Sequence, residues 1–222
     1  MSSRKIPFEN EEYYHVFNRG VDKRIVFTDK QELDFFFSRL SALNNTVADM
    51  TGRNHRRSNY TGKARVEESE GLVSVVAYCL LPNHFHLLLK QNVDQGISKF
   101  MQRLGTSYTV FFNQKHQRNG SLFQGKFKAK HLTGEYGLST VATYVNLNYQ
   151  HHKINPKENL VKSSIFEYLQ TEQGKFICDE TEVKNVMSEI GTIKAYKKYA
   201  KNLSIVFARN KGIELSDKDF EM

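Results

Sequence analysis

The chain of 222 residues is long enough to bury a core, and its hydrophobic content of 39% with 12% aromatic residues indicates a globular protein. Lysine and arginine exceed aspartate and glutamate by eight, which favours polyanionic partners and nucleic acid first, because a positive field attracts phosphate groups. No apolar run is long enough to span a bilayer and the N-terminal residues lack the apolar centre of a secretory signal, so we expect a cytoplasmic protein without a membrane partner.

The first quarter of the chain predicts a strand, a helix and a polar segment. Residues 13–18, "YYHVFN", are aromatic or β-branched and predict a strand that ends in a turn at Arg19 and Gly20. Asp29 can cap a helix that follows, because apolar side chains recur there with a period near 3.6. Those side chains are Leu33, Phe36, Phe37, Leu40 and Leu43. Residues 44–70 are polar and charged and predict a loop or a small insertion.

Two histidines lie in the apolar run "LLPNHFHLLLK" at 80–90. Residues 72–80 predict a strand that Pro82 and Asn83 reverse into a second strand, which gives a hairpin. Alternate residues of a strand share a face, so His84 and His86 lie side by side. Neutral imidazoles bind metal ions, and this pattern is compatible with a metal site. Taken alone, the pattern is more typical of a half-buried strand whose histidines bond to backbone or water.

A helix and a lysine-bearing strand are predicted next. Asp94 can cap a helix over 95–114, in which apolar residues recur at helical spacing. In "SLFQGKFKAK", at 121–130, Phe123 and Phe127 fall on one face of a predicted strand. The opposite face carries Gln124, Lys126, Lys128 and Lys130. This strand is expected to present lysines to a partner.

The last third of the chain predicts helices. A helix is expected from about Leu138 to His151. Tyr144 and Asn148 are four residues apart on it, so their side chains lie on the same face and can contact the same group. Residues 156–222 predict a C-terminal helical extension. Basic residues also cluster at 53–57, 115–131 and 194–201. These clusters indicate either a nucleic-acid surface or solvated faces.

Five segments resemble one protein family and stand in that family's order. They are "YHVFNRG", "LLPNHFHLLL", "YTVFFNQKH", "GSLFQGKFK" and "YVNLN". The chain is similar to the HUH-type single-tyrosine transposases, and closest to the REP-associated tyrosine transposase branch. The resemblance covers residues 13–149 apart from the polar segment, and "SSIFEYL" at 163–169 is similar to the tail of that branch. The sequence departs from the family at Tyr149, where a proline is usual.

The resemblance implies a fold, a metal site and a nucleophile. The implied fold is α+β, an antiparallel sheet with helices packed on it, as in the ferredoxin-like core of HUH endonucleases. The transposase or nuclease domain would then occupy residues 1–155. His84 and His86 would bind a divalent metal, Mg or Mn, with Asn148 as the remaining protein ligand. Tyr144 would attack DNA to form a 5′-phosphotyrosine. The function implied is metal-dependent cleavage and rejoining of single-stranded DNA, at sequences that contain a hairpin.

Several alternatives remain open at this stage. Arg19, Lys126, Lys128 and Lys130 are expected to bind the DNA, and a monomer is slightly favoured over a homodimer. Tyr108 is a rival nucleophile better explained as core, while Tyr149 and Tyr136 are exposed candidates. His15 and His116 can assist at the site. A DNA-binding protein without catalysis, or a metal phosphoesterase that uses water, would also fit these residues.

Overall fold

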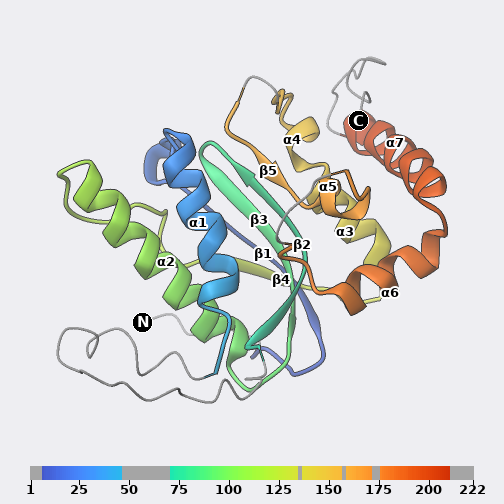
Figure 1. Cartoon of the computed structure of the whole chain (residues 1–222), viewed down its shortest axis with the longest axis horizontal. Helices are drawn as coiled ribbons and strands as arrows, with labels where there is room; N and C mark the ends of the chain where they lie inside the picture. Colours follow the sequence, from blue (N-terminus) through green and yellow to red (C-terminus); the bar gives the residue numbers. More distant parts are fainter. Residues whose placement is uncertain (1–6, 47–70, 135–136, 157–158, 172–175, 211–222) are drawn as a thin grey trace.

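The computed structural model describes residues 7–46, 71–134, 137–156, 159–171 and 176–210 (Figure 1). The strands are β1 (Tyr13–Arg19), β2 (Val73–Leu81), β3 (His84–Gln91), β4 (Lys128–His131) and β5 (Lys162–Ser163). The helices are α1 (Lys30–Ala42), α2 (Gly96–Lys115), α3 (Leu138–Asn146), α4 (Asn148–His151), α5 (Ile165–Tyr168), α6 (Glu180–Ile190) and α7 (Ile193–Asn210), with the 3-10 turn η1 (Val21–Lys23). From residue 47 on, the predicted polar segment 44–70 lies outside the described residues.

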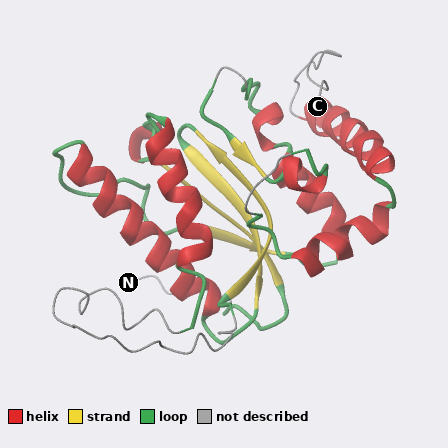
Figure 2. Cartoon of the chain, in the orientation of Figure 1, coloured by secondary structure: helices red, strands yellow, loops and turns green. Residues whose placement is uncertain are grey.

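One antiparallel sheet forms the centre of the described structure. Its five strands follow the order β4-β1-β3-β2-β5, and every neighbouring pair is antiparallel. Helices α1 and α2 cover one face, whereas α3, α4, α6 and α7 gather on the other (Figures 1 and 2). The predicted α+β class, an antiparallel sheet with helices packed on it, is confirmed.

The predicted hairpin is the middle of the sheet. β2 and β3 pair from Val73 opposite Gln91 to Leu81 opposite His84, and Pro82 and Asn83 form the turn. Residues that stand opposite one another in an antiparallel pair point to the same face. This pairing therefore fixes which side chains of the hairpin meet each helical layer.

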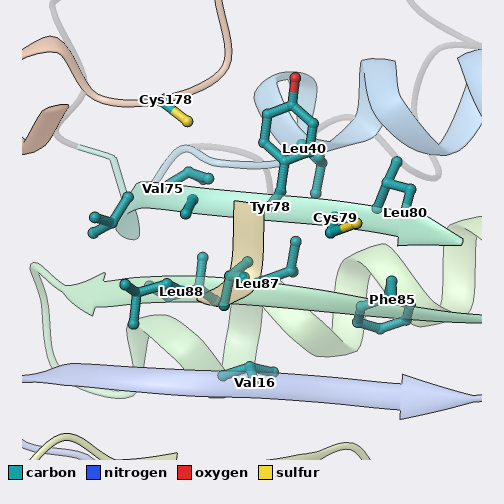
Figure 3. Packing of buried hydrophobic residues seen from close by; sticks show 14 of the residues in the cluster. Val16, Leu40, Val75, Tyr78, Cys79, Leu80, Phe85, Leu87, Leu88 and Cys178 are labelled. Atoms are coloured by element: carbon teal, nitrogen blue, oxygen red, sulfur yellow. The ribbon is translucent and has the colours of Figure 1, made fainter. Parts of the chain in front are cut away.

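Buried aliphatic and aromatic side chains of the central strands form the core (Figure 3). Val16, Leu87 and Tyr78 stand side by side on β1, β3 and β2, and all three are buried. Burying a side chain of this size stabilises the fold by about 1.5–3 kcal/mol. The hairpin that carries the two histidines is thus held in one register by its packing.

The first helical layer confirms two sequence predictions. The Asp29 carboxylate accepts a hydrogen bond from the Glu32 amide and caps α1 as expected. Phe36 of α1 packs on Phe85 of β3, with ring centroids 5.2 Å apart. Helix α2 covers the range predicted for it within one residue, and the buried Tyr108 hydroxyl donates to the Val26 carbonyl.

A buried carboxylate links α1 to the end of α2. Glu32 is fully buried and accepts hydrogen bonds from the Thr28 amide and hydroxyl at 2.7 and 2.9 Å. Its other oxygen lies 2.5 Å from His116 Nε2 and 3.3 Å from Lys115 Nζ. Burial raises the pKa of this carboxyl group, but the hydrogen bonds from Thr28, His116 and Lys115 outweigh burial, so the net pKa is lowered.

We expect Glu32 to make the protein sensitive to acid. A carboxyl group with a lowered folded-state pKa stabilises the fold above its unfolded-state pKa of about 4.3, and that stability is lost as the pH falls through the folded-state pKa. Urea unfolding between pH 7 and 3 should therefore show a steeper acid loss in the wild type than in Glu32→Gln, which cannot titrate. Parallel pH profiles for the two proteins would contradict this assignment.

The second helical layer is joined to the sheet by polar contacts. Asp179 caps α6 by accepting from the Thr181 and Glu182 amides. The Glu182 carboxylate accepts from the Tyr13 hydroxyl at 2.8 Å and pairs with Lys90 Nζ at 3.2 Å. The predicted helical character of the C-terminal segment is confirmed in α6 and α7, while its division from the rest at residue 155 stays a prediction.

Candidate active site

The two strand histidines lie on the face of β3 opposite to Phe85. Their ring centroids are 5.2 Å apart, so the predicted side-by-side placement is confirmed. His84 Nδ1 lies 2.6 Å from Asn83 Oδ1. Because an amide oxygen only accepts, Nδ1 of His84 carries the proton and Nε2 keeps its lone pair. The turn residue before the strand thus orients the ring for ligand binding.

His15 holds the second strand histidine by a hydrogen bond between the two rings. Its Nε2 lies 2.8 Å from His86 Nδ1. Loss of solvent around the ring, with a smaller effect of Lys130, lowers the pKa of His15 to about 4. His15 is therefore neutral at pH 7 and places no charge beside His86. Of the two assisting histidines expected from the sequence, His15 lies at the site, whereas His116 bonds to Glu32 in the other layer.

Tyr144 of α3 lies in a pocket beside these histidines. The pocket has a volume of about 520 Å³, and His15, His86 and Lys130 line it together with the tyrosine. The Tyr144 ring meets the His15 ring edge to face at 5.9 Å and stacks on His151 at 4.9 Å. The predicted nucleophile and one of the predicted metal ligands therefore share one cavity.

The helix predicted from about Leu138 to His151 has these bounds in the structure, but it is interrupted at Leu147 and is not continuous. Leu147 leaves the helical conformation, with φ −99° and ψ 13°, and separates α3 from α4. Its side chain is buried in the core, where the chain makes a tight turn closed by the Gln150 amide and the Leu147 carbonyl. Tyr144 and Asn148 thus belong to two helical segments, and their spacing alone does not bring them together.

Asn148 nevertheless lies against β2, the strand that pairs with the histidine strand. The backbone N–H groups of Asn148 and Tyr149 bond to the Cys79 thiol, and Cys79 stands opposite His86 in the hairpin. The Asn148 side chain is fully buried, and neither of its amide atoms has a hydrogen-bond partner within the described residues. Buried amides are nearly always satisfied, so this group is suited to a ligand that the protein alone does not supply.

A third histidine, His152, was missed by the sequence analysis. It follows α4 and lies with its Nε2 3.2 Å from Nε2 of His84, and the two ring centroids are 4.6 Å apart. One nitrogen from each of His84, His86 and His152 lies within 4.8 Å of the others, so the three can hold a metal ion. The only signal in the sequence is the pair "HH" at 151–152, directly after the tyrosine helix.

The rival tyrosines differ from Tyr144 in burial. Tyr108 is buried, as expected for a core residue, and burial raises its pKa. The expectation that Tyr149 is exposed is wrong, because this residue is only 4% exposed and burial raises its pKa as well. A buried phenol cannot meet a DNA strand without unfolding its surroundings. Tyr136 lies outside the described residues.

The lysine strand is shorter than predicted. The strand expected over 121–130 forms only as β4, because Gly120 and Gly125 adopt positive φ values of 88° and 69° and turn the chain before it. Lys128 and Lys130 are exposed on β4. Lys126 precedes the strand and lines a groove together with Phe85, on the side of the sheet that faces away from His86. The expectation that all three lysines share one face is therefore wrong.

Arg19 stands at the end of β1, directly opposite His84. Since opposite residues point to the same face, its side chain lies on the histidine side of the sheet. Its Nε is buried and has no hydrogen-bond partner among the residues that the structure describes. A phosphate oxygen would satisfy this donor.

Comparisons with known proteins agree with the motifs in the sequence. Residues 54–148 match the family model described as "Transposase IS200 like". This match confirms the resemblance to transposases and the enzyme class, a transposase, that the motifs indicated. No curated protein sequence gives a significant match.

Solved structures similar to this chain include a REP-associated tyrosine transposase bound to a REP hairpin. It shares 11% sequence identity with this chain, the TM-score is 0.48, and the alignment covers 82% of this chain and 96% of the other.

In the described parts of this chain, no helix combines the length and the apolar character needed to cross a membrane.

Proposed function

We propose that this transposase cleaves and rejoins single-stranded DNA through a covalent bond to Tyr144, with a divalent metal, Mg or Mn, at His84 and His86. The observation that carries the proposal is the shared pocket of Tyr144, His15 and His86 on one face of the sheet. A phenol and His86, one of the imidazoles that can hold a metal, meet there in a cavity lined by a lysine. The substrate with a hairpin follows from the sequence resemblance.

The cleavage step is a phosphoryl transfer to the phenol. Tyr144 Oη attacks the phosphorus atom, a bond from Oη to phosphorus forms, and the bond from phosphorus to the 3′ oxygen breaks. The phenol gives up its proton and the departing 3′ oxygen gains one, so the products are a 5′-phosphotyrosine and a free 3′-hydroxyl. A bound metal would polarise the phosphate and spread the charge that develops on it. The phosphotyrosine keeps a reactive phosphodiester, so the reverse attack can rejoin DNA.

The surrounding residues prepare this step. Asn83 and His15 orient the two strand histidines by hydrogen bonds. The buried amide of Asn148, which lacks a partner among the described residues, is proposed as a further protein ligand. The rings of His15, His151 and Phe207 surround the Tyr144 ring and fix its orientation.

We propose that Arg19, Lys128 and Lys130 contact the phosphates of the strand. Lys130 lines the tyrosine pocket, Lys128 lies two residues before it on the same face, and Arg19 stands beside His84. Lys126 remains a proposed contact only for a part of the DNA that reaches the groove on the other side of the sheet.

This placement predicts the salt dependence of binding. For single strands the log–log slope of affinity against salt is about −0.7 for each neutralised phosphate, so the double variant Lys128→Ala, Lys130→Ala should flatten it by about 1.4. A control variant, Lys99→Ala with Lys184→Ala, removes the same charge from exposed positions on α2 and α6. Fluorescence anisotropy from 50 to 300 mM salt measures both. Equal slopes for the two variants would place the DNA elsewhere.

The decisive experiment for the proposed function is a trapping assay. The protein is incubated with end-labelled hairpin-bearing single strands and Mn²⁺, and the products are separated under denaturing conditions. A labelled band that migrates with the protein and is abolished by a chelator is the expected result. Binding without any cleavage would identify a non-catalytic DNA-binding protein, and cleavage without an adduct would identify a phosphoesterase that uses water.

A further inference from the structure

The exposed imidazole of His152 lies at the end of α4. His152 follows the last residue of that helix, and its ring contacts His84. His84 in turn is buried and belongs to the proposed metal site. The contact therefore places His152 beside the proposed metal site.

The chemistry of the contact points to a shared cation. Nδ1 of His84 carries its proton toward Asn83, so Nε2 of His84 offers a lone pair toward His152. The two Nε2 atoms are 3.2 Å apart. When two imidazole nitrogens bind one ion, each metal–nitrogen distance is about 2.1 Å. With a nitrogen–metal–nitrogen angle between a right angle and the tetrahedral angle, the two nitrogens then lie about 3.0–3.4 Å apart. The observed separation falls in that range.

The backbone places His152 and Asn148 on one side of a single turn. Asn148 opens α4, and His152, four positions later, is the C-cap residue of that helix, which ends there with φ −103° and ψ 5°. Residues at this spacing lie above one another on the same face of a helix. The turn that carries the buried amide toward the sheet thus also carries an imidazole to His84.

From these contacts we infer that His152 is a metal ligand of this transposase, in addition to His84, His86 and Asn148. The inference rests on the proposed metal site. It changes the character of that site, because three imidazoles make it rich in nitrogen donors. Mg²⁺ prefers oxygen ligands, whereas Mn²⁺, Co²⁺ and Zn²⁺ accept imidazole readily. The site is therefore selective for transition metals over Mg²⁺.

Cobalt binding tests this inference without any measurement of DNA cleavage. Co²⁺ is titrated into the wild-type protein and into His152→Ala, and the visible absorption of the bound ion is recorded together with the dissociation constant. Even outer-shell partners of a metal site change affinity about 10–100-fold, so loss of a direct ligand should weaken Co²⁺ binding at least tenfold and shift the absorption band. Excess Mg²⁺ should fail to displace Co²⁺ from the wild type.

Control variants separate this inference from the proposed function. His116→Gln removes an imidazole from the opposite side of the sheet and should bind Co²⁺ like the wild type, whereas His84→Ala should lose binding. If His152→Ala binds Co²⁺ as tightly as the wild type while His84→Ala does not, the inference is overturned and the proposed metal site stands. If the wild type itself binds no Co²⁺, both are overturned. Because His152 is exposed, its replacement leaves the fold intact, and circular dichroism verifies this.

Discussion

Tyr144→Phe is expected to abolish the covalent protein–DNA adduct while the protein still folds and binds both metal and DNA. The substitution removes one oxygen atom and keeps the ring, so the contacts with His15, His151 and Phe207 remain. No other group of the variant supplies the attacking oxygen at that position. The trapping assay should show no adduct, a loss of more than about 1,000-fold if the phenol is the sole nucleophile.

A second tyrosine provides a matched control for this result. Tyr108→Phe removes a phenol oxygen that donates to the buried Val26 carbonyl, so it should lower the free energy of unfolding by about 1–3 kcal/mol. The same variant should form the adduct like the wild type. An adduct that persists in Tyr144→Phe would refute the assignment, and mass spectrometry of the trapped peptide would then identify the attacking residue.

His84→Ala and His86→Ala are each expected to abolish cleavage in Mn²⁺. Each variant removes an imidazole nitrogen from the proposed site, and we expect at least a 100-fold loss of cleavage rate, because outer-shell changes alone cost about 10–100-fold. Protons compete with metal for imidazole, so metal affinity should also fall as the pH is lowered through about 6.5. Single-turnover cleavage and isothermal titration with Mn²⁺ measure the two effects.

His116→Gln is the control for the effects expected of His84→Ala and His86→Ala. This residue lies in the other helical layer beside Glu32, and glutamine keeps a hydrogen-bond donor there. Cleavage and Mn²⁺ affinity should match those of the wild type. Wild-type cleavage by His84→Ala would show that the strand histidines are structural, and the DNA-binding alternative would then be preferred.

Local periodicity explains why the sheet and the first helical layer could be predicted. The alternation in β3 and the apolar stripe of α2 are set by residues close together in the chain, and each has one arrangement that buries its apolar face. The face shared by His84 and His86 follows from the same alternation. The pocket could be predicted only from the family resemblance. No short-range sequence pattern indicates that Tyr144 lies beside β3, which is more than fifty residues earlier in the chain.

The features that the sequence did not reveal depend on contacts between distant segments. The break occurs at Leu147, a buried residue, and the helical periodicity of the sequence continues through it. The contact of His152 with His84 joins two residues 68 positions apart. The late start of the lysine strand follows from positive φ at Gly120 and Gly125, which the alternating pattern did not indicate.

Helix α7 has a consequence for how a minimal active protein should be defined. Its Phe207 ring lines the tyrosine pocket, 4.9 Å from Tyr144 and 5.3 Å from His151, and the Ser204 hydroxyl donates to Gln150 of α4 at 3.2 Å. A protein shortened to residues 1–155 would retain every candidate catalytic residue, yet its pocket would be open to solvent where α7 stood. We therefore expect that a truncated protein, a fusion or a graft needs α7 in order to cleave DNA.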